Sequence, residues 1–335
     1  MRLFSFLLLI ITSFAIHSEP VTDKVDYVST INKVKQLMRQ YHYNPDELKQ
    51  QDYLDMEQKM DALGQSSSDP KTFVDSFNSL WQTGPFSHVR MQQAPQTADQ
   101  IAAYLDGLNV GEQATSLSIT SNTAVMTVNT MMGNDTIQAI TNHYNTIINK
   151  GIKNLVIDLR NNEGGAFAVK PLVGHLAVKP IDIGVFVSQP WNAKNTKQPG
   201  LKQATNQKAW DGWSIRRFWT DVQEQDFIRI QLQPETPVFE GNVYVLLSKR
   251  TASAAEMAAD ALSYLPNVTL VGETTAGQML SQSIFDVSPG IQMFLPIADY
   301  YSHQSGRIEG AGVKPDIEVN ADKSLEKAMN LIGTK

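Results

Sequence analysis

The residue in this chain best placed for nucleophilic chemistry is Ser253, which lies between alanines in the segment Thr251–Glu256. An apolar run over 243–247 predicts a buried strand before it, and a helix is expected over 256–264. Small neighbours let a substrate carbonyl approach, and the free N–H groups of a helix N-terminus can stabilise an oxyanion. Because serine is also a common helix N-cap, this segment alone leaves both interpretations open.

A candidate base for such a serine is His88, which directly follows Ser87 in the segment 84–90. Histidine is the usual general base near neutral pH, since its ordinary pKa lies close to that range. A histidine in a loop is most often simply solvated. The neighbouring hydroxyl of Ser87 could orient the ring, and we take the pair as a hypothesis.

Two further motifs could complete a catalytic group. Gly164 and Gly165 follow a predicted buried strand over 154–158, and glycine allows the backbone torsions that turn an N–H toward a ligand. An ordinary strand-to-helix turn is the alternative. Glu309 lies between glycines, where a carboxylate is either a turn charge or the acid that orients a catalytic histidine.

The predicted elements that position these residues are helices in the first part of the chain and alternating strands and helices after it. Three- and four-residue apolar spacing predicts helices from residue 21 to about 81, the last over 70–81 after an Asp-Pro start. After Pro85 strands and helices alternate, which is typical of an α/β fold. The strands are expected at 116–120, 123–128, 154–158, 243–247 and 268–271, and the helices at 135–149, 166–176 and 256–264.

The expected domain organisation has three parts. Residues 1–18 form a signal peptide, 19–85 a helical N-terminal subdomain, and 86–335 an α/β core. Within the core, a polar and tryptophan-containing stretch over about 180–239 is expected to be a surface excursion, suited to a lid or a flap facing the substrate.

The N-terminus has the pattern of a secretory signal peptide. Arg2 precedes a short apolar run that ends in small residues, with cleavage expected after Ala15 or Ser18. A membrane anchor is the alternative, but the apolar run is too short to span a bilayer comfortably. We therefore expect a periplasmic or secreted protein with no membrane span after cleavage.

Composition excludes several classes of function. The 335 residues are 42% hydrophobic with a formal net charge of −6, and no block of like charge favours nucleic-acid binding. The absence of cysteine excludes disulfides, thiolate metal sites and cysteine nucleophiles. No metal or cofactor is expected, and the oligomeric state is open.

Taken together and in this order, four segments resemble the C-terminal processing protease superfamily of serine peptidases, which includes tail-specific peptidases and the tricorn core. The resemblance covers residues from about 86 to 319. The matching segments are Asp158–Gly165, Thr251–Glu256, Val271–Gly277 and Glu309–Asp316. Each segment alone is weak, but four ordered motifs are specific.

The resemblance implies the fold and part of the site. It implies a β-β-α spiral core shared with the Clp protease and crotonase families, behind a helical subdomain. It also implies that Ser253 is the nucleophile, with an oxyanion hole formed by the N–H of Ala254 and that of Gly164 or Gly165.

The base departs from the tail-specific pattern. Those enzymes place a lysine at the end of the Gly-Glu-x-Thr-x-Gly turn, where this chain has Gln278, which cannot accept a proton at neutral pH. The tricorn-like branch instead uses a serine and histidine pair with a glutamate. By that resemblance His88 is the base, and Ser87 bridges its ring to Glu309.

A second departure is the room for a PDZ domain, which tail-specific enzymes insert before the core. The predicted hairpin and helices already fill the chain between His88 and the strand at 154–158, so a PDZ domain of ordinary size does not fit. Substrate choice is then expected to lie in the core cleft or in the excursion.

The expected function is that of a serine endopeptidase acting on peptide or protein substrates through a Ser-His-Ser-Glu tetrad. One alternative is a peptidase with a displaced lysine base, Lys249 or Lys170. Another is a non-catalytic ligand-binding protein on the same fold, which the missing lysine motivates. An acyl-transfer or hydratase enzyme of the crotonase type is disfavoured, because no basic cluster is present for the phosphates of a thioester carrier.

Overall fold

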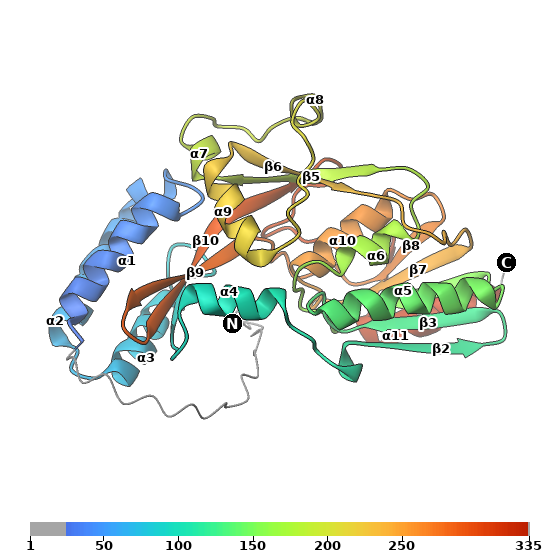
Figure 1. Ribbon diagram of the computed structural model, residues 1–335, viewed down its shortest axis with the longest axis horizontal. Coiled ribbons are helices and arrows are strands. Elements are labelled where there is room, and N and C mark those ends of the chain that lie inside the picture. Colours follow the sequence, from blue (N-terminus) through green and yellow to red (C-terminus); the bar gives the residue numbers. More distant parts are fainter. Residues whose placement is uncertain (1–24, 334–335) are drawn as a thin grey trace.

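The computed structural model describes residues 25–333, which form two β-sheets with helices packed around them (Figure 1). The expected signal peptide over 1–18 lies outside the described residues. Within residues 25–333 no helix combines the length and the apolar character that crossing a membrane requires. The predicted α/β fold class is confirmed.

The N-terminal helices form a separate cluster at one end of the molecule (Figure 1). They are α1 (Tyr27–Tyr41), α2 (Gln51–Ser66) and α3 (Pro70–Trp81), with a short 3-10 turn, η1 (Glu47–Lys49). The side chains of Asp26 and Asp69 cap α1 and α3 by accepting N–H groups of their first turns. The apolar faces of these helices pack against one face of the first sheet.

The first sheet has β10 at its centre. Its main path runs β1-β10-β5-β6, and β9 and β11 also pair with β10. Helices α4 and α9 cover the face opposite the N-terminal helices. The bounds are β1 (Arg90–Gln93), β5 (Ile181–Ser188), β6 (Phe227–Leu232), β9 (Ser281–Ser288), β10 (Ile291–Ser302), β11 (Gly306–Arg307), α4 (Ala98–Asp106) and α9 (Ile215–Glu224).

The second sheet is largely parallel and buried on both faces, with the order β12-β8-β7-β4-β3-β2. Only β2 runs antiparallel to its neighbour. Alternate residues of its central strands face α5, α6 and α10 on one side and α11 on the other, so these strands read as continuous apolar runs. The bounds are β2 (Thr115–Thr120), β3 (Thr123–Val128), β4 (Asn154–Asp158), β7 (Asn242–Leu247), β8 (Val268–Gly272), β12 (Ile317–Glu318), α5 (Asn134–Asn149), α6 (Val169–Gly174), α10 (Ala254–Ser263), α11 (Ala321–Gly333) and the turn η2 (Glu112–Ala114).

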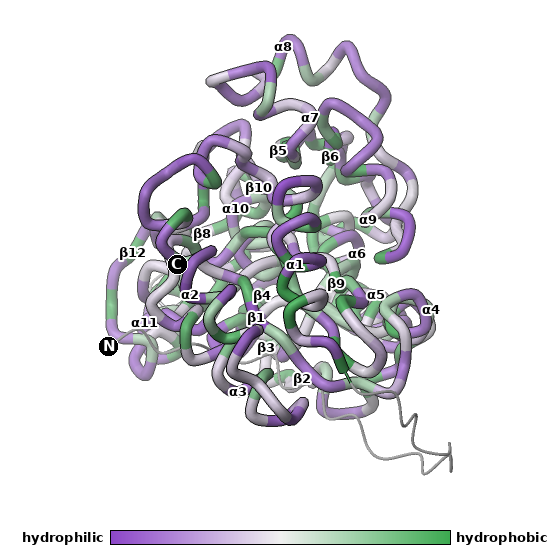
Figure 2. Tube along the Cα trace, turned by 90° about the vertical axis from the view of Figure 1, so that its left-hand side faces the viewer, coloured by the Kyte–Doolittle hydropathy of each residue, from purple (hydrophilic) through white to green (hydrophobic). Residues whose placement is uncertain are grey.

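The segment over 180–239 differs from the expected surface excursion. Its two ends are β5 and β6, which pair with each other inside the first sheet, and β5 is almost entirely buried. Most of the part outside the sheet is residues 189–226, with α7 (Gln189–Asn192), α8 (Leu201–Ala204) and α9, and residues 233–239 follow β6 without regular structure. In Figure 2 the chain around α8 is mostly hydrophilic and extends outward at the top, although Trp191 of α7 and Ala204 of α8 are buried against β5 and β6.

The helix predicted over 166–176 is shorter than expected. The N–H groups of Ala166 and Ala168 both donate to the carbonyl of Met131, so the chain after the glycine pair stays irregular. Helix α6 therefore begins only at Val169. This irregular stretch brings the glycine pair beside the start of α10, as described next.

Candidate active site

The nucleophile candidate Ser253 is the N-cap of α10 and has a strained backbone. Its φ of 54° and ψ of −125° lie where a side chain is seldom tolerated. The backbone N–H of Ser253 donates to Glu256 Oε2 at 3.0 Å, which holds this conformation. The next N–H, that of Ala254, has no hydrogen-bond acceptor among the described residues. The turn thus presents one hydroxyl and one free donor.

Glu256 is a fully buried carboxylate that organises the nucleophile turn. Besides the N–H of Ser253, it accepts hydrogen bonds from Thr275 Oγ1 at 2.5 Å, Gly277 N at 2.7 Å and Gln278 N at 2.9 Å. Burial raises the pKa of Glu256, and these hydrogen bonds offset only part of that shift. Sequence reasoning missed this role, although a serine followed three residues later by glutamate is the pattern of a capping box.

The glycine pair lies against Ser253, and its two N–H groups differ. Gly164 N–H donates to Asn162 Oδ1 at 2.9 Å, whereas Gly165 N–H has no acceptor in the described part of the chain. Both glycines have positive φ, +104° and +137°. A Cβ atom on Gly164 would come within 2.6 Å of Ser253 Cβ, so only glycine permits this approach. Of the pair, Gly165 is the one with a free donor.

Ser87, His88 and Glu309 are brought together from opposite ends of the chain. Ser87 Oγ lies 2.7 Å from His88 Nδ1 and donates to Glu309 Oε1 at 3.2 Å. Since the hydroxyl hydrogen is used toward the carboxylate, the histidine must donate from Nδ1 to Oγ. This leaves Nε2 of His88 without a hydrogen and able to accept a proton.

The electrostatics of His88 agree with a neutral ring at neutral pH. Burial lowers its pKa below the usual value, and the charge of Glu309, with an oxygen 4.0 Å from Nδ1, opposes this shift. Among the described residues no hydrogen bond joins His88 to Ser253. Hydrogen bonds of this kind are commonly long in unliganded sites and tighten when substrate binds.

The turn that carries Gln278 is held by two carboxylates. Glu256 accepts the N–H groups of Gly277 and Gln278, and Glu309 Oε2 accepts those of Met279 at 2.6 Å and Leu280 at 3.1 Å. One turn therefore connects the nucleophile to the carboxylate beside His88.

The two lysines considered as displaced bases lie in other surroundings. The side chain of Lys249 is 80% exposed, and its Nζ lies 3.8 Å from Glu273. Lys170 Nζ lies 4.8 Å from the ring centre of Trp213. In neither case does a hydrogen bond connect the amine to Ser253 among the described residues. Among residues 25–333, no group of three His, Asp or Glu side chains could hold a metal ion.

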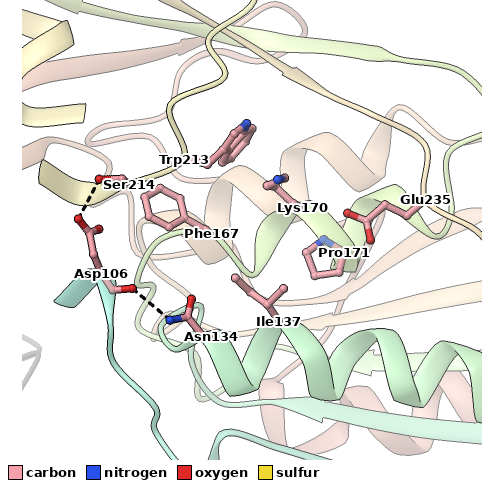
Figure 3. Close-up of a pocket in the computed structure, with 9 residues that line it drawn as sticks. All are labelled: Asp106, Asn134, Ile137, Phe167, Lys170, Pro171, Trp213, Ser214 and Glu235. Carbon is pink, nitrogen blue, oxygen red and sulfur yellow. Dashed lines mark hydrogen bonds between the residues drawn. The ribbon is translucent and has the colours of Figure 1, made fainter. Parts of the chain in front are cut away.

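A cavity of about 190 Å³ lies between residues of α4, α5, α6 and the segment 189–226, and it is also lined by Phe167, two residues after the glycine pair (Figure 3). Phe167 and Trp213 form its aromatic wall, and Trp213 comes from the segment 189–226. Asp106 on α4 accepts hydrogen bonds from Ser214 Oγ and the N–H of Ile215, which fixes the start of α9 at the cavity rim. A smaller adjoining cavity shares Asp106, Asn134, Ile137 and Phe167 with it and reaches Met131, Met132 and Ala166.

Comparison with known families identifies the chain. The family model described as peptidase family S41 matches residues 122–319. This chain belongs to peptidase family S41. The matched region contains Ser253, the glycine pair and Glu309, whereas Ser87 and His88 precede it.

Among curated relatives, the S41 chain is 28% identical over 167 residues to a carboxyl-terminal-processing protease of Synechocystis, covering 50% of this chain and 31% of the relative. It is 26% identical over 189 residues to the carboxy-terminal processing protease CtpA of Bacillus subtilis, covering 56% and 33%. The alignments thus span about a third of the length of these relatives.

Solved structures with the same fold include a lipoprotein from Streptococcus agalactiae, with a TM-score of 0.61, 16% identity, and coverage of 96% of this chain and 99% of the other. A photosystem II D1 C-terminal processing protease gives a TM-score of 0.59, 14% identity, and coverage of 92% and 97%. The core has the Clp-protease-like fold of the C-terminal processing proteases, as the sequence resemblance implied.

Proposed function

We propose that this S41 chain is a serine endopeptidase in which Ser253 is the nucleophile and His88 the general base. Ser87 orients the imidazole, and Glu309 orients Ser87 and balances the imidazolium charge. The observation that carries the proposal is the hydroxyl of Ser87 between His88 Nδ1 and Glu309 Oε1. That arrangement leaves His88 Nε2 as a proton acceptor, as a serine nucleophile requires.

The proposed reaction has two stages. His88 Nε2 takes the proton of Ser253 as Oγ attacks the scissile carbonyl carbon, and the N–H groups of Ala254 and Gly165 stabilise the oxyanion. The C–N bond breaks when the imidazolium gives its proton to the leaving amine. Water, deprotonated by His88, then hydrolyses the acyl-enzyme and restores Ser253. No metal or cofactor takes part.

Peptide or protein substrates are supported by family membership, and the names of the relatives suggest processing near a carboxyl terminus. A periplasmic or secreted location is supported by the signal-peptide pattern at residues 1–18. Both belong to the proposal.

A fluorophosphonate probe and a peptide-library digest test this function. The wild-type protein is expected to cleave peptides and to be labelled, and Ser253→Ala is expected to lose both. Ser66→Ala, at an exposed position of α2, serves as the matched control. Full activity in Ser253→Ala would overturn the assignment.

A second candidate is a non-catalytic ligand-binding protein. It is favoured by one observation, the lack of a hydrogen bond between His88 and Ser253 among the described residues. A folded wild-type protein with neither peptidase activity nor fluorophosphonate labelling would support this candidate against the first.

A further inference from the structure

Arg90 presents a partly buried guanidinium that has no acceptor. Its Cζ lies 3.4 Å from the centre of the Phe294 ring, which is the residue opposite it on β10. In the described chain no hydrogen bond or ion pair uses its N–H groups. None of its nitrogens is among the fully enclosed polar atoms without a partner, so the group still reaches solvent.

The other arginines of the described residues behave differently. Each has a carboxylate within 4.0 Å, as the geometry of the guanidinium favours. They are Arg39, Arg160, Arg216, Arg217, Arg229, Arg250 and Arg307.

The direction of Arg90 follows from strand alternation. Its neighbours Val89 and Met91 pack into the cluster of the N-terminal helices, so Arg90 points to the opposite face of the first sheet. Phe294 lies on that opposite face and packs with the cluster under α4 and α9. The strand begins two residues after His88, whose carbonyl accepts a hydrogen bond from Gln282 of β9 at 3.0 Å.

The cluster on this face of the sheet includes a residue of the smaller cavity, which lies next to the glycine pair. Leu105 on α4 and Ile215 on α9 line the smaller cavity together with Met132 and Ala166. A Cβ atom on Gly165 would come within 2.5 Å of Met132 N, so that cavity borders the proposed oxyanion hole. Leu105 packs in the same cluster as Phe294, the ring beneath Arg90, so this cluster connects the Arg90 site to that cavity.

Partial burial removes part of the hydration of this charge, and no protein group of the described chain replaces it. Burial is unfavourable for a charged group, and the ring of Phe294 offsets only part of that cost. Burial lowers the pKa of Arg90 to about 10, so the group is still protonated at neutral pH. A planar guanidinium fork matches a carboxylate with two parallel hydrogen bonds.

We propose that Arg90 is a substrate-binding residue whose guanidinium receives a carboxylate of the peptide, from the chain terminus or from an Asp or Glu side chain. Phe294 holds the guanidinium plane in place, and the carboxylate supplies the missing acceptors. The enzyme thereby selects peptides with a negative charge close to the scissile bond. This inference deepens the proposed peptidase function and rests on it.

Peptide binding measured by fluorescence anisotropy in a Ser253→Ala background tests the inference without requiring cleavage. Three kinds of labelled peptide, based on one neutral sequence, are compared: a C-terminal amide, a free acid, and a series of amides with one Glu at successive positions. A charged hydrogen bond contributes about 1.5–3 kcal/mol, so at least one carboxylate peptide should bind about tenfold or more tighter than the neutral amide. The free-acid and Glu series distinguish the two sources of carboxylate.

Adding Arg90→Gln should remove this preference and change the affinity for the neutral amide by less than about twofold. Arg39→Gln, an exposed residue paired with Glu57, changes the net charge equally and should keep the preference. Arg90→Met keeps an apolar contact with Phe294 and gives a second, better-packed test should the glutamine variant unfold.

The inference would be overturned if the Ser253→Ala protein showed no preference for a carboxylate peptide. It would also be overturned if the added Arg90→Gln or Arg90→Met substitution left that preference unchanged. Cleavage by wild type is measured separately. An active enzyme without the preference refutes only the role of Arg90, and an inactive protein with the preference refutes only the peptidase assignment.

Discussion

Ser253 and His88 share a backbone feature that their side chains do not explain. Both have positive φ, 54° and 68°, a conformation that costs roughly 1–3 kcal/mol and persists only where the surroundings enforce it. For Ser253 the hydrogen bond to Glu256 enforces it, and for His88 the bond from Gln282 to its carbonyl contributes. Strain of this kind concentrates at functional sites, which supports the proposed pair.

Glu309→Gln should alter the pH dependence of activity in a predictable direction. The charge of Glu309 raises the pKa of His88 against the larger lowering by burial. Removing the charge should lower that pKa further. Since the base must be neutral, activity rises with pH through this pKa, and the acidic limb of kcat/KM should move to lower pH.

The same variant should lose about 100-fold in kcat, because the imidazolium that forms during attack is no longer balanced. The measurement is kcat/KM of peptide cleavage from pH 4 to 9. Glu224→Gln, an exposed residue of α9, should leave both the limb and the rate unchanged. A limb that moves to higher pH would contradict the proposed relay.

Gly165→Ala tests the oxyanion hole. Its φ of +137° is unfavourable for alanine, and a Cβ atom would meet Met132 N at 2.5 Å, so the N–H should turn away from the reaction centre. We expect kcat to fall about 100-fold or more. Gly151→Ala has positive φ without any close contact, and should cost stability only. Equal kcat in the two variants would exclude Gly165 as a donor.

Among the elements, the turn between β8 and β9 holds two carboxylates of the candidate site in place. In tail-specific relatives, as the sequence resemblance implies, this turn carries the catalytic lysine. Here its N–H groups donate to Glu256 and Glu309, which connects the start of α10 to the loop containing Glu309. The turn therefore helps to position the nucleophile Ser253, through Glu256, and the base His88, through Glu309. It does not itself supply a catalytic side chain.

Glu256→Gln should disturb this turn. A glutamine amide has one acceptor oxygen, and its NH₂ group would face N–H donors, so hydrogen bonds are lost in a buried place. We expect about 1–3 kcal/mol less stability in urea unfolding. Displacement of Ser253 should lower kcat about tenfold or more with little change in KM, and should slow fluorophosphonate labelling by a similar factor.

Glu224→Gln again provides the matched charge control for this variant. Loss of stability with unchanged kcat and labelling rate would show that Glu256 supports the fold without positioning the nucleophile.

Across the whole molecule, the first sheet connects the N-terminal helices with the second sheet and its helices. Its central strand β10 contributes Asp299, which is fully buried and pairs with Arg307 of β11 at 2.6 Å. Arg307 Nη2 also lies 3.5 Å from Tyr43 Oη, at the end of α1. A buried charge therefore sits where the helices, the sheet and the Glu309 loop meet.

This buried carboxyl should make stability depend on pH. Burial raises the pKa of Asp299 to about 6, against a usual value of 3.8. The folded state binds the proton more tightly than the unfolded state, so this contribution is fully present below pH 3.8 and is lost as pH rises through 6. The free energy of unfolding should fall by up to about 3 kcal/mol relative to Asp299→Asn between pH 4 and 7.

Urea unfolding of wild type and Asp299→Asn at several pH values measures this difference. For Asp75→Asn, at an exposed residue paired with Lys71, the free energy of unfolding should depend on pH in the same way as in the wild type. A constant gap between wild type and Asp299→Asn across the range would contradict the assignment.

Much of the architecture could be predicted from local pattern. The helix over 70–81 matches α3, because an Asp cap, a proline start and apolar spacing all act within one segment. The strand at 154–158 matches β4 for a similar reason. The sequence pattern over 180–239 predicts an excursion instead of strands β5 and β6, because the pairing of these strands depends on contacts between residues 40 to 51 positions apart.

The reactive groups of this protein can be read from its sequence: a serine at a strand-to-helix turn, a glycine pair, a histidine preceded by serine, and no lysine at position 278. How these groups are arranged depends on the packing of segments that are distant in the sequence. This packing left the N–H of Gly165 free by giving that of Gly164 to Asn162, and it set Ser87 against Glu309 across 222 positions of sequence. Such outcomes depend on distances between remote segments, which local propensity and spacing do not contain.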